Sequence, residues 1–147
     1  MESPVVTAAE MRAAEEAAFA RGVSAESLMD EAARGIARTV EKFFPQPGRC
    51  LIFAGKGNNA GDAFAAAKLL GEKGWQIEVR LAFAEKAIGK LARKKLDVVA
   101  GVADPGQNAP PLEWAGVSAP GYNRPRTIIL DGLLGLGAKP PLREPIR

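Results

Sequence analysis

The sequence predicts an α/β fold with a mostly parallel β-sheet, preceded by two N-terminal helices. Two observations indicate this: strand-like apolar runs alternate with helix-like segments, and two of those runs lead directly into glycine-rich loops. The chain has 147 residues, of which 47% are apolar, enough for one domain with a substantial core. We therefore treat residues 1–147 as a single domain.

Two helices are predicted before the first strand. Thr7 and Glu10 have the spacing of a capping box, and Gly22 is suited to end the helix that they begin. Ser24 can cap a second helix, which ends before the proline-rich stretch 45–48. The apolar residues expected on the buried faces are Met11, Ala14, Ala18 and Phe19 in the first helix and Leu28, Ala32, Ile36, Val40 and Phe43 in the second.

Three strands and two further helices follow in alternation. The predicted strands are a continuous apolar run at 50–54, the alternating stretch 75–81 and another buried apolar run at 127–131. Helices are predicted between them, over 63–73 and over 85–99. Right-handed crossovers would bring both glycine-rich loops to the carboxyl edge of one sheet, where open α/β folds bind ligands.

The composition excludes several classes of chemistry. These 147 residues contain no histidine, which rules out histidine triads and histidine metal sites, and the one cysteine, Cys50, is expected to be a small buried side chain. A formal charge of +3 is small for a nucleic-acid-binding protein. The N-terminus lacks a signal-peptide core, and no apolar run approaches the roughly 20 residues of a membrane span. The cytoplasm is therefore the expected location.

One basic cluster is the only feature that favours nucleic-acid binding. Such a cluster is more often the solvated face of a helix, and we prefer that interpretation. Its members are Lys86, Lys90, Arg93, Lys94 and Lys95.

The first glycine-rich loop, GKGNNAGDAF at 55–64, directly follows the first predicted strand. It fits the form G-x-G-x-x-A, in which Gly55 and Gly57 let backbone amides approach a ligand and the next helix directs its free amides at a phosphate. A P-loop is excluded, because no lysine follows Gly61. A dehydrogenase would want an acid closing the second strand, which ends in LAFA. A loop that only packs, without a ligand, remains open.

Polar oxygen donors accompany the glycines of this edge. Asn58, Asn59 and Asp62 offer amide oxygens and a carboxylate, which suit a cation or sugar hydroxyls, and Asp131 ends the third strand nearby. Asn59 and Asp131 together resemble a hard-cation site. Two simpler interpretations stay open: Asp131 caps the amides of the loop that follows it, and Asp62 is an acid favourably placed at a helix N-terminus.

Four segments form a recognisable pattern: TAAEMRAAEE at 7–16, SLMDEAARGIA at 27–37, GKGNNAGDAFAAAKLL at 55–70 and LDGLLGLGAKPPLREPI at 130–146. In their order and spacing they resemble the N-terminal YjeF family, whose enzymatic members are NAD(P)H-hydrate epimerases. The resemblance implies a Rossmann-like three-layer αβα domain. It also implies an isomerase that interconverts the R and S forms of NADH or NADPH hydrated at ring carbon 6. A nucleotide-dependent dehydratase, acting on one form, can then restore the cofactor.

The resemblance also implies a set of site residues. Potassium would be bound by Asn59 and Asp131, and Arg143 matches the arginine that follows the second loop. The implied partners are the hydrated cofactor and the dehydratase, with no nucleic acid or membrane, and a homodimer is compatible with the family. The residues implied in binding the hydrate are Asn58, Asn59, Ala60, Gly61, Asp62, Gly135, Leu136, Gly137, Ala138, Lys139, Pro140 and Pro141.

The chain departs from the family pattern at several positions. Ala60 and Ala63 replace glycines of the family loop G-N-N-G-G-D-G, and Leu136 replaces a small hydroxyl residue. If position 60 requires a positive φ, its methyl group would strain the site. The favoured acid–base aspartate belongs to a D-x-P-S-G segment that would lie beyond Arg147, so no catalytic residue is assigned and we expect a fragment of a longer protein. The alternative is a non-catalytic YjeF-type scaffold that binds a nucleotide or a protein.

Overall fold

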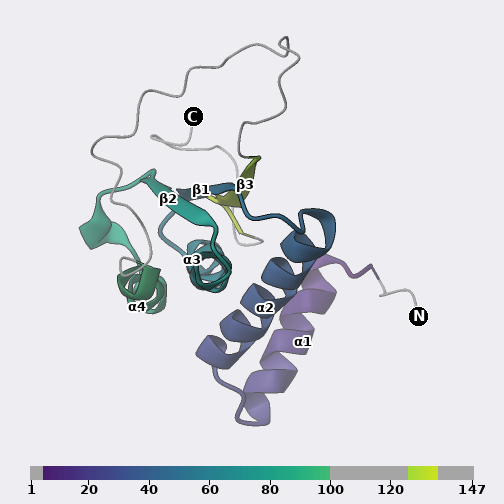
Figure 1. Ribbon diagram of the computed structural model, residues 1–147. Coiled ribbons are helices and arrows are strands. Elements are labelled where there is room, and N and C mark those ends of the chain that lie inside the picture. The colour runs from purple at the N-terminus through teal and green to yellow at the C-terminus, as the bar shows by residue number, and fades with distance from the viewer. Residues whose placement is uncertain (1–4, 100–125, 136–147) are drawn as a thin grey trace.

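The computed structural model describes residues 5–99 and 126–135. Its three strands form one parallel sheet in the order β2-β1-β3 (Figure 1). Two helices precede the first strand, so the predicted α/β fold class is confirmed. The elements are α1 (Ala8–Ala20), α2 (Ala25–Phe43), β1 (Arg49–Ala54), α3 (Asn58–Glu72), β2 (Gln76–Leu81), the short 3₁₀ helix η1 (Glu85–Ala87), α4 (Lys90–Val99) and β3 (Thr127–Gly132).

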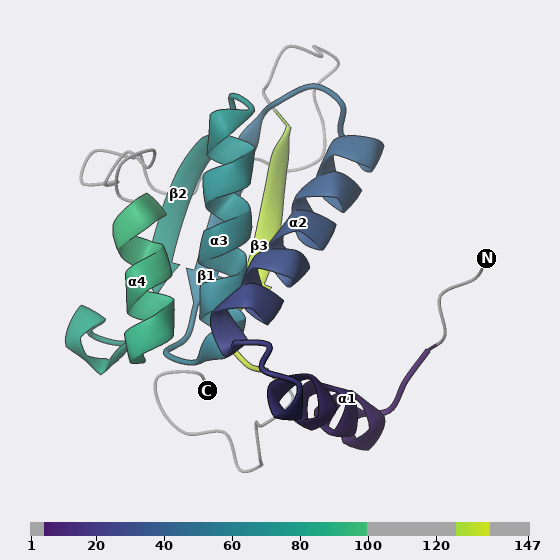
Figure 2. The ribbon, with the colours of Figure 1, turned by 90° about the horizontal axis from the view of Figure 1, so that it is seen from below.

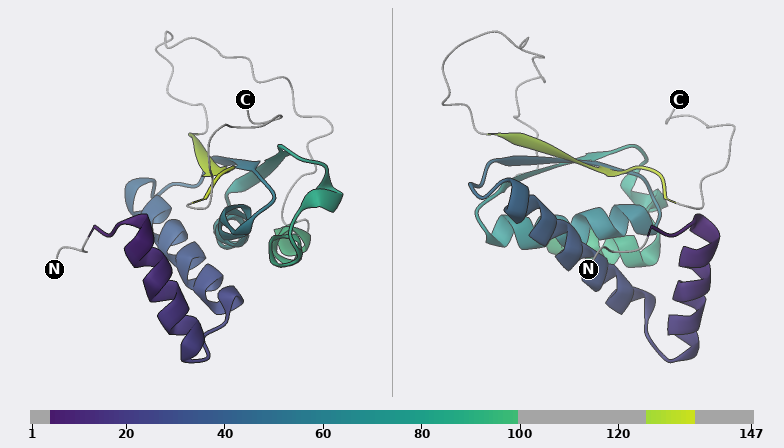
Figure 3. Two further views of the ribbon diagram at one scale, coloured as in Figure 1. Left: turned by 180° about the vertical axis from the view of Figure 1, so that it is seen from behind. Right: turned by 90° about the vertical axis from the view of Figure 1, so that its right-hand side faces the viewer.

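Helices α2, α3 and α4 cover one face of the sheet (Figures 1 and 3). α3 lies in the middle, contacts all three strands and is flanked by α2 and α4. Residues 5–99 and 126–135 do not include the second helix layer of the expected three-layer domain. At one end of the molecule, the carboxyl ends of the strands lie near the start of α3, η1 and α1 (Figure 2). That end is where the two glycine-rich loops begin.

The core lies between β1 and α3. The strand β1 is buried on both faces as predicted: Cys50, Ile52 and Ala54 pack with Phe64 and Leu70 of α3, and Leu51, which points to the other face, is only 2% exposed. Burial raises the pKa of the Cys50 thiol to about 12, so it is a packed side chain and not a nucleophile. β3 differs from the prediction of a buried strand, because it is one of the two outer strands of the described sheet and Ile129 is 61% exposed.

Both predicted helix caps are present at the N-terminus. Thr7 and Glu10 form the capping box, with the backbone amide of Thr7 donating to Glu10 Oε2 at 2.6 Å, and Ser24 Oγ accepts from the amide of Ser27 at 3.1 Å. Gly22 has φ +84 after the end of α1, as a helix-ending glycine should. The predicted apolar face of α1 is largely wrong, because Ala18 is its only buried residue.

The buried face of α2 agrees with the prediction only in part. Val40 is buried and Ile36 packs against the core, as predicted. Ala32 and Phe43 are exposed instead of buried, and along most of the helix the buried position is the next residue in the chain. The reason lies on α3: the Met29 side chain occupies the space over Gly61, which has no side chain of its own. The buried residues of α2 are Met29, Ala33, Ala37 and Val40.

Two helix starts differ from the predictions by five residues each. α3 begins at Asn58 and not at Ala63, because Gly57 is extended (φ -101, ψ -167) and its carbonyl accepts the amides of Ala60 and Gly61. α4 begins at Lys90 and not at Glu85, and the residues before it form η1 instead. Seven of the ten residues of the supposed loop GKGNNAGDAF therefore belong to the helix.

The polar face predicted for the second strand has one exception. Glu78 of β2 is only 6% exposed, and its carboxylate forms ion pairs with Arg49 of β1 and Arg80. A buried carboxylate needs such partners to offset its loss of hydration. Within the described part of the chain, no helix is long and apolar enough to cross a membrane.

Candidate functional site

The two glycine-rich loops meet at the carboxyl edge, as predicted. Ala54 at the end of β1 pairs with Gly132 at the end of β3, and the amide of Gly55 donates to the carbonyl of Gly132 at 3.0 Å. A Cβ atom on Gly55 would lie 2.2 Å from the carbonyl oxygen of Leu133. Glycine at position 55 is thus required for the loops to approach this closely.

Asn59 joins the two loops through its side chain. Its Nδ2 donates to the carbonyl of Asp131 at 3.3 Å and to that of Leu134 at 3.0 Å. Gly135 lies against the same side chain, since a Cβ atom there would be 3.4 Å from Asn59 Cβ. The first turn of α3 therefore holds the start of the second glycine-rich loop in place.

Asp131 caps the loop that follows it and remains exposed. Its Oδ1 accepts from the amide of Leu133 at 2.9 Å, which bears out one of the two simpler interpretations. No described residue bonds its other carboxylate oxygen, which is free for a ligand. Among the described residues, no three or more His, Cys, Asp or Glu side chains are grouped so that they could hold a metal ion. A cation here would thus depend on Asn59, Asp131 and neighbouring carbonyls, a donor set of oxygens that suits a hard ion.

Asp62 lies in the second turn of α3 and not at its N-terminus. The interpretation of Asp62 as an acid favourably placed at a helix N-terminus is therefore wrong, because the first turn of α3 contains no acid. The side chain is half-buried, and no described residue forms a hydrogen bond or ion pair with it. Burial, and secondly the charge of Glu15 on α1, raise the pKa of Asp62 to about 6. Near neutral pH this carboxyl group is poised to accept or donate a proton.

Ala60 and Gly61 belong to the packed interior. Ala60 is fully buried, and no residue other than glycine has a positive φ in the described segments. The strain expected at position 60 is therefore absent, because Ala60 lies in the first turn of α3 with a negative φ. Its Cα lies close to β3, since a Cβ atom added to Gly132 would be 3.2 Å away from it. Both amides already donate to the carbonyl of Gly57. Their role in binding the hydrate stays a prediction, with less geometric support than that of Asn58, Asn59 and Asp62.

Restoring the family glycine at position 60 should weaken the fold without improving the site. Ala60→Gly removes a buried methyl group and adds the helix cost of glycine, a loss of about 1.5 kcal/mol in the free energy of unfolding. Urea denaturation checks it, with Ala32→Gly on the exposed face of α2 as a control that should lose only the propensity part. A more stable Ala60→Gly protein would contradict this account.

The first amides of α3 are open to a ligand. The backbone N–H groups of Asn58 and Asn59 have no partner among the described residues, and the side chain of Asn58 is exposed beside them. Unpaired amides at the start of a helix favour an anion. Gly135 is described and exposed, while the remaining predicted ligands of the second loop, and Arg143, lie outside the described residues. Those ligands are Leu136, Gly137, Ala138, Lys139, Pro140 and Pro141.

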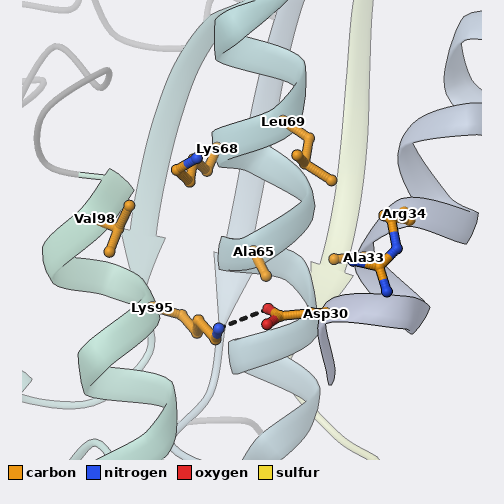
Figure 4. Close-up of a pocket in the computed structure, with 8 residues that line it drawn as sticks. All are labelled: Asp30, Ala33, Arg34, Ala65, Lys68, Leu69, Lys95 and Val98. Atoms are coloured by element: carbon orange, nitrogen blue, oxygen red, sulfur yellow. Dashed lines mark hydrogen bonds and ion pairs between the residues drawn. The ribbon is translucent and has the colours of Figure 1, made fainter. Parts of the chain in front are cut away.

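A separate pocket of about 320 Å³ opens between α2, α3 and α4 (Figure 4). Lys95 reaches across it to Asp30 with a 2.6 Å ion pair. Its other cations are paired as well, Arg34 with Glu31 and Lys68 with Glu72. This pocket thus holds a network that joins helices, and the unpaired polar groups lie at the sheet edge. Its lining residues are Asp30, Ala33, Arg34, Ala65, Lys68, Leu69, Lys95 and Val98.

Two residues of the carboxyl edge, the basic Lys56 and the aromatic Phe83, were not predicted as part of the site from the sequence. Lys56 follows Gly55, and its Nζ lies 5.2 Å from the centroid of the Phe83 ring, two residues after β2. The available signal was a lysine inside the glycine-rich loop, together with an aromatic residue in LAFA.

Comparison with known proteins agrees with this arrangement. A family model described as the YjeF-related protein N-terminus matches residues 25–147, which include α2, the whole sheet and both glycine-rich loops. The chain belongs to this family. The YjeF-type chain also resembles a crystal structure of the yeast protein ynu0, with a TM-score of 0.74 at 22% identity, covering 98% of this chain and 62% of that one. That likeness shows the fold alone.

Curated relatives give the family a biochemical context. An NAD(P)H-hydrate epimerase of Rhodopirellula baltica is 37% identical over 79% of this chain and 45% of its own length. One from Cereibacter sphaeroides is 32% identical over 89% of this chain and 63% of its own length. A bifunctional NAD(P)H-hydrate repair enzyme of Archaeoglobus fulgidus is 37% identical over 84% of this chain and 24% of its own length. This YjeF-type chain therefore spans only part of the length of each relative.

Proposed function

We propose that this YjeF-type chain acts in NAD(P)H-hydrate epimerisation, interconverting the R and S forms of NADH and NADPH hydrated at ring carbon 6. The observation that carries the proposal is the contact between Asn59 and the loop after β3, directly beside the free amides of α3. The similar proteins named NAD(P)H-hydrate epimerase support it. The alternative of a non-catalytic scaffold is not favoured, because those relatives carry an enzyme's name.

The proposed reaction needs no covalent bond between the substrate and the protein. The ring nitrogen of the hydrate can donate its lone pair and expel the C6 hydroxyl group, and water can then return to either face of the planar ring. The protein must hold the ring, exclude bulk water and supply a proton as hydroxide leaves. Asn58 and Asn59 offer amides and side chains for holding the substrate, and the half-buried carboxyl group of Asp62 offers a hydrogen-bond partner for one of its hydroxyl groups.

Asp62 supports the proposal because its burial lowers the stability of the fold, and no contact with another described residue compensates for this loss. An unpaired, half-buried carboxylate destabilises a fold, and groups of this kind gather at functional sites. In the proposed reaction it bonds a hydroxyl group of the hydrate. The acid–base group at ring carbon 6 itself is left unassigned among the described residues.

A potassium ion is proposed at Asn59 and Asp131. Their oxygens are the type of donor that an alkali cation takes, and the two residues adjoin across the loops. Such an ion would supply fixed positive charge beside the substrate. The residues themselves hold the loop after β3 against α3, which is the part of the arrangement that binding of the hydrate needs.

Asp131→Asn should weaken any activation by potassium. The asparagine oxygen can still accept the amide of Leu133, so the loop cap survives while the negative charge is lost. We expect the potassium concentration for half-maximal activity to rise about tenfold, a change of about 1.4 kcal/mol in binding. Asp97→Asn, on the exposed face of α4, is the control. An unchanged potassium response would remove the cation from the proposal.

The proposed partner is a nucleotide-dependent dehydratase that consumes one epimer. Several similar proteins are named bifunctional repair enzymes, which fits coupling of the two activities. The cytoplasm, where the reduced cofactors are used, is the proposed location.

The test combines the protein with hydrated NADH and an excess of a dehydratase specific for one epimer. Without epimerisation, the epimer that the dehydratase ignores persists. Rapid loss of this residual epimer on addition of the protein is the expected result, followed by chromatography of the two forms. Persistence of the epimer at the rate of the protein-free control would refute the epimerase function and leave the scaffold alternative.

A further inference from the structure

Most cations of the described helices α2, α3 and α4 form ion pairs with nearby acids. On α4, Arg93 pairs with Glu85 at 2.6 Å and with Asp97 at 3.0 Å. Lys94 and Lys95 reach the acids of α2, with Lys94 2.8 Å from Glu26. These three members of the basic cluster therefore serve to join or stabilise helices.

Three lysines at the carboxyl edge have no such partner. Lys56, Lys86 and Lys90 are exposed, and no acid of the described segments forms an ion pair with them. They come from three separate pieces of the chain at that edge: the loop after β1, η1 and the first residue of α4. Figure 2 shows η1 and the start of α4 beside the loop that leads into α3.

Hydrogen bonds hold these pieces together. The amide of Gly89 donates to the carbonyl of Lys56 at 2.8 Å, which ties the loop after β1 to the residue preceding Lys90. Glu85, the acid of η1, forms its ion pair with Arg93 and not with any of the three lysines. The local charge of the three lysines is thus left uncompensated on the described surface.

Lys56 is also pre-positioned. Its ammonium group lies over the ring of Phe83, 5.2 Å from the centroid, an arrangement that restrains the long side chain without neutralising its charge. Phe83 follows β2, so the restrained ammonium stands over the β2 side of the edge. Asn59 and Asp131 stand on the β3 side.

A dinucleotide bound along a parallel sheet crosses its carboxyl edge, and the residues after the second strand contact the adenosine ribose in folds of this kind. A 2′-phosphate on that ribose is recognised by cations there. We propose that Lys56, Lys86 and Lys90 bind the 2′-phosphate of the substrate, so that the protein prefers hydrated NADPH to hydrated NADH. This inference rests on the proposed function and names the form of the cofactor on which it acts.

The test compares two adenosine ligands and two hydrates. By calorimetry, the protein should bind adenosine 2′,5′-bisphosphate about tenfold more tightly than adenosine 5′-monophosphate, and its kcat/KM should favour hydrated NADPH by a similar factor. Lys56→Gln should remove most of this preference, and Lys56→Gln combined with Lys86→Gln and Lys90→Gln should abolish it. Lys68→Gln changes the net charge equally but removes a paired lysine, and it should leave the preference intact.

Equal affinity for the two adenosine ligands in the unaltered protein would overturn the inference. So would an equal loss of preference in Lys68→Gln, because the effect would then reflect net charge only. The results that would refute the proposed reaction differ from those that would refute the phosphate site. Selective binding of the bisphosphate without epimerisation refutes the proposed reaction and keeps the phosphate site. Epimerisation of both hydrates at equal kcat/KM refutes the phosphate site alone.

Discussion

Asp62→Asn should make the protein more stable at pH 8 and less active. The pKa of Asp62 is raised from 3.8 to about 6, so the folded protein binds a proton more tightly than the unfolded chain between those values. The contribution of Asp62 to stability therefore falls as pH rises from about 4 to about 6, and above pH 6 the half-buried carboxylate is a cost. A shift of about two units corresponds to a gain of about 2 kcal/mol for asparagine at pH 8, after allowance for partial exposure.

Urea denaturation at pH 8 and at pH 4 checks this prediction. The gain should be present at pH 8 and should largely vanish at pH 4, where the wild-type carboxyl group is protonated in the folded state. Glu15→Gln should lower the pKa of Asp62, because the charge of Glu15 is the second cause of the shift. Glu16→Gln, an exposed neighbour on α1, is the control.

Equal stability of Asp62→Asn and the wild type at pH 8 would show that the carboxyl group is not destabilising. The activity measurement is separate. If Asp62 bonds the hydrate, Asp62→Asn should lose at least about tenfold in kcat/KM, although the protein is more stable. A variant that is more stable and fully active would exclude Asp62 from the substrate site.

Gly55→Ala should cause the largest loss of stability at the sheet edge. Its new methyl group would lie 2.2 Å from the carbonyl oxygen of Leu133, which is backbone and cannot rotate away. The ends of β1 and β3 must separate, breaking the 3.0 Å hydrogen bond from Gly55 to Gly132. Overpacking of this kind costs about 3 kcal/mol. The loop after β3 would also leave Asn59, so activity should fall together with stability.

Gly35→Ala is the matched control for this substitution. Nothing lies within 4 Å of a Cβ at Gly35, which is a helical residue of α2, and alanine there should stabilise the protein by about 0.5 to 1 kcal/mol. The midpoints of thermal unfolding should move in opposite directions for the two variants. A Gly55→Ala protein with wild-type stability would mean that the two loops do not pack as described.

Local features made much of the fold predictable. Thr7, Glu10 and Ser24 cap helices because their partners lie three residues away in the chain. The glycine-rich loops could be assigned to one edge because parallel strands place their carboxyl ends together. The same rule predicts that Asn59 and Asp131 lie close together, and in the structure the side-chain amide of Asn59 donates to the backbone carbonyl of Asp131.

Other features depended on neighbours that are distant in sequence. The face of α2 that is buried follows from the gap above Gly61 on α3, and periodicity alone could not resolve a rotation of one residue. The same applies to Ala60, which is buried because α3 packs it close to Gly132 of β3.

The sequence by itself determined the order of elements, the helix caps and the sheet edge at which polar groups gather. These depend on interactions within a few residues or on the rules of parallel sheets. Only the tertiary structure decided the charge state of Asp62 and the separation of paired from unpaired lysines. A pKa depends on burial and on charges brought close by folding, and ion pairs such as Lys95 with Asp30 join residues 65 apart. Chemistry at the edge is therefore set by contacts between helices that no local pattern encodes.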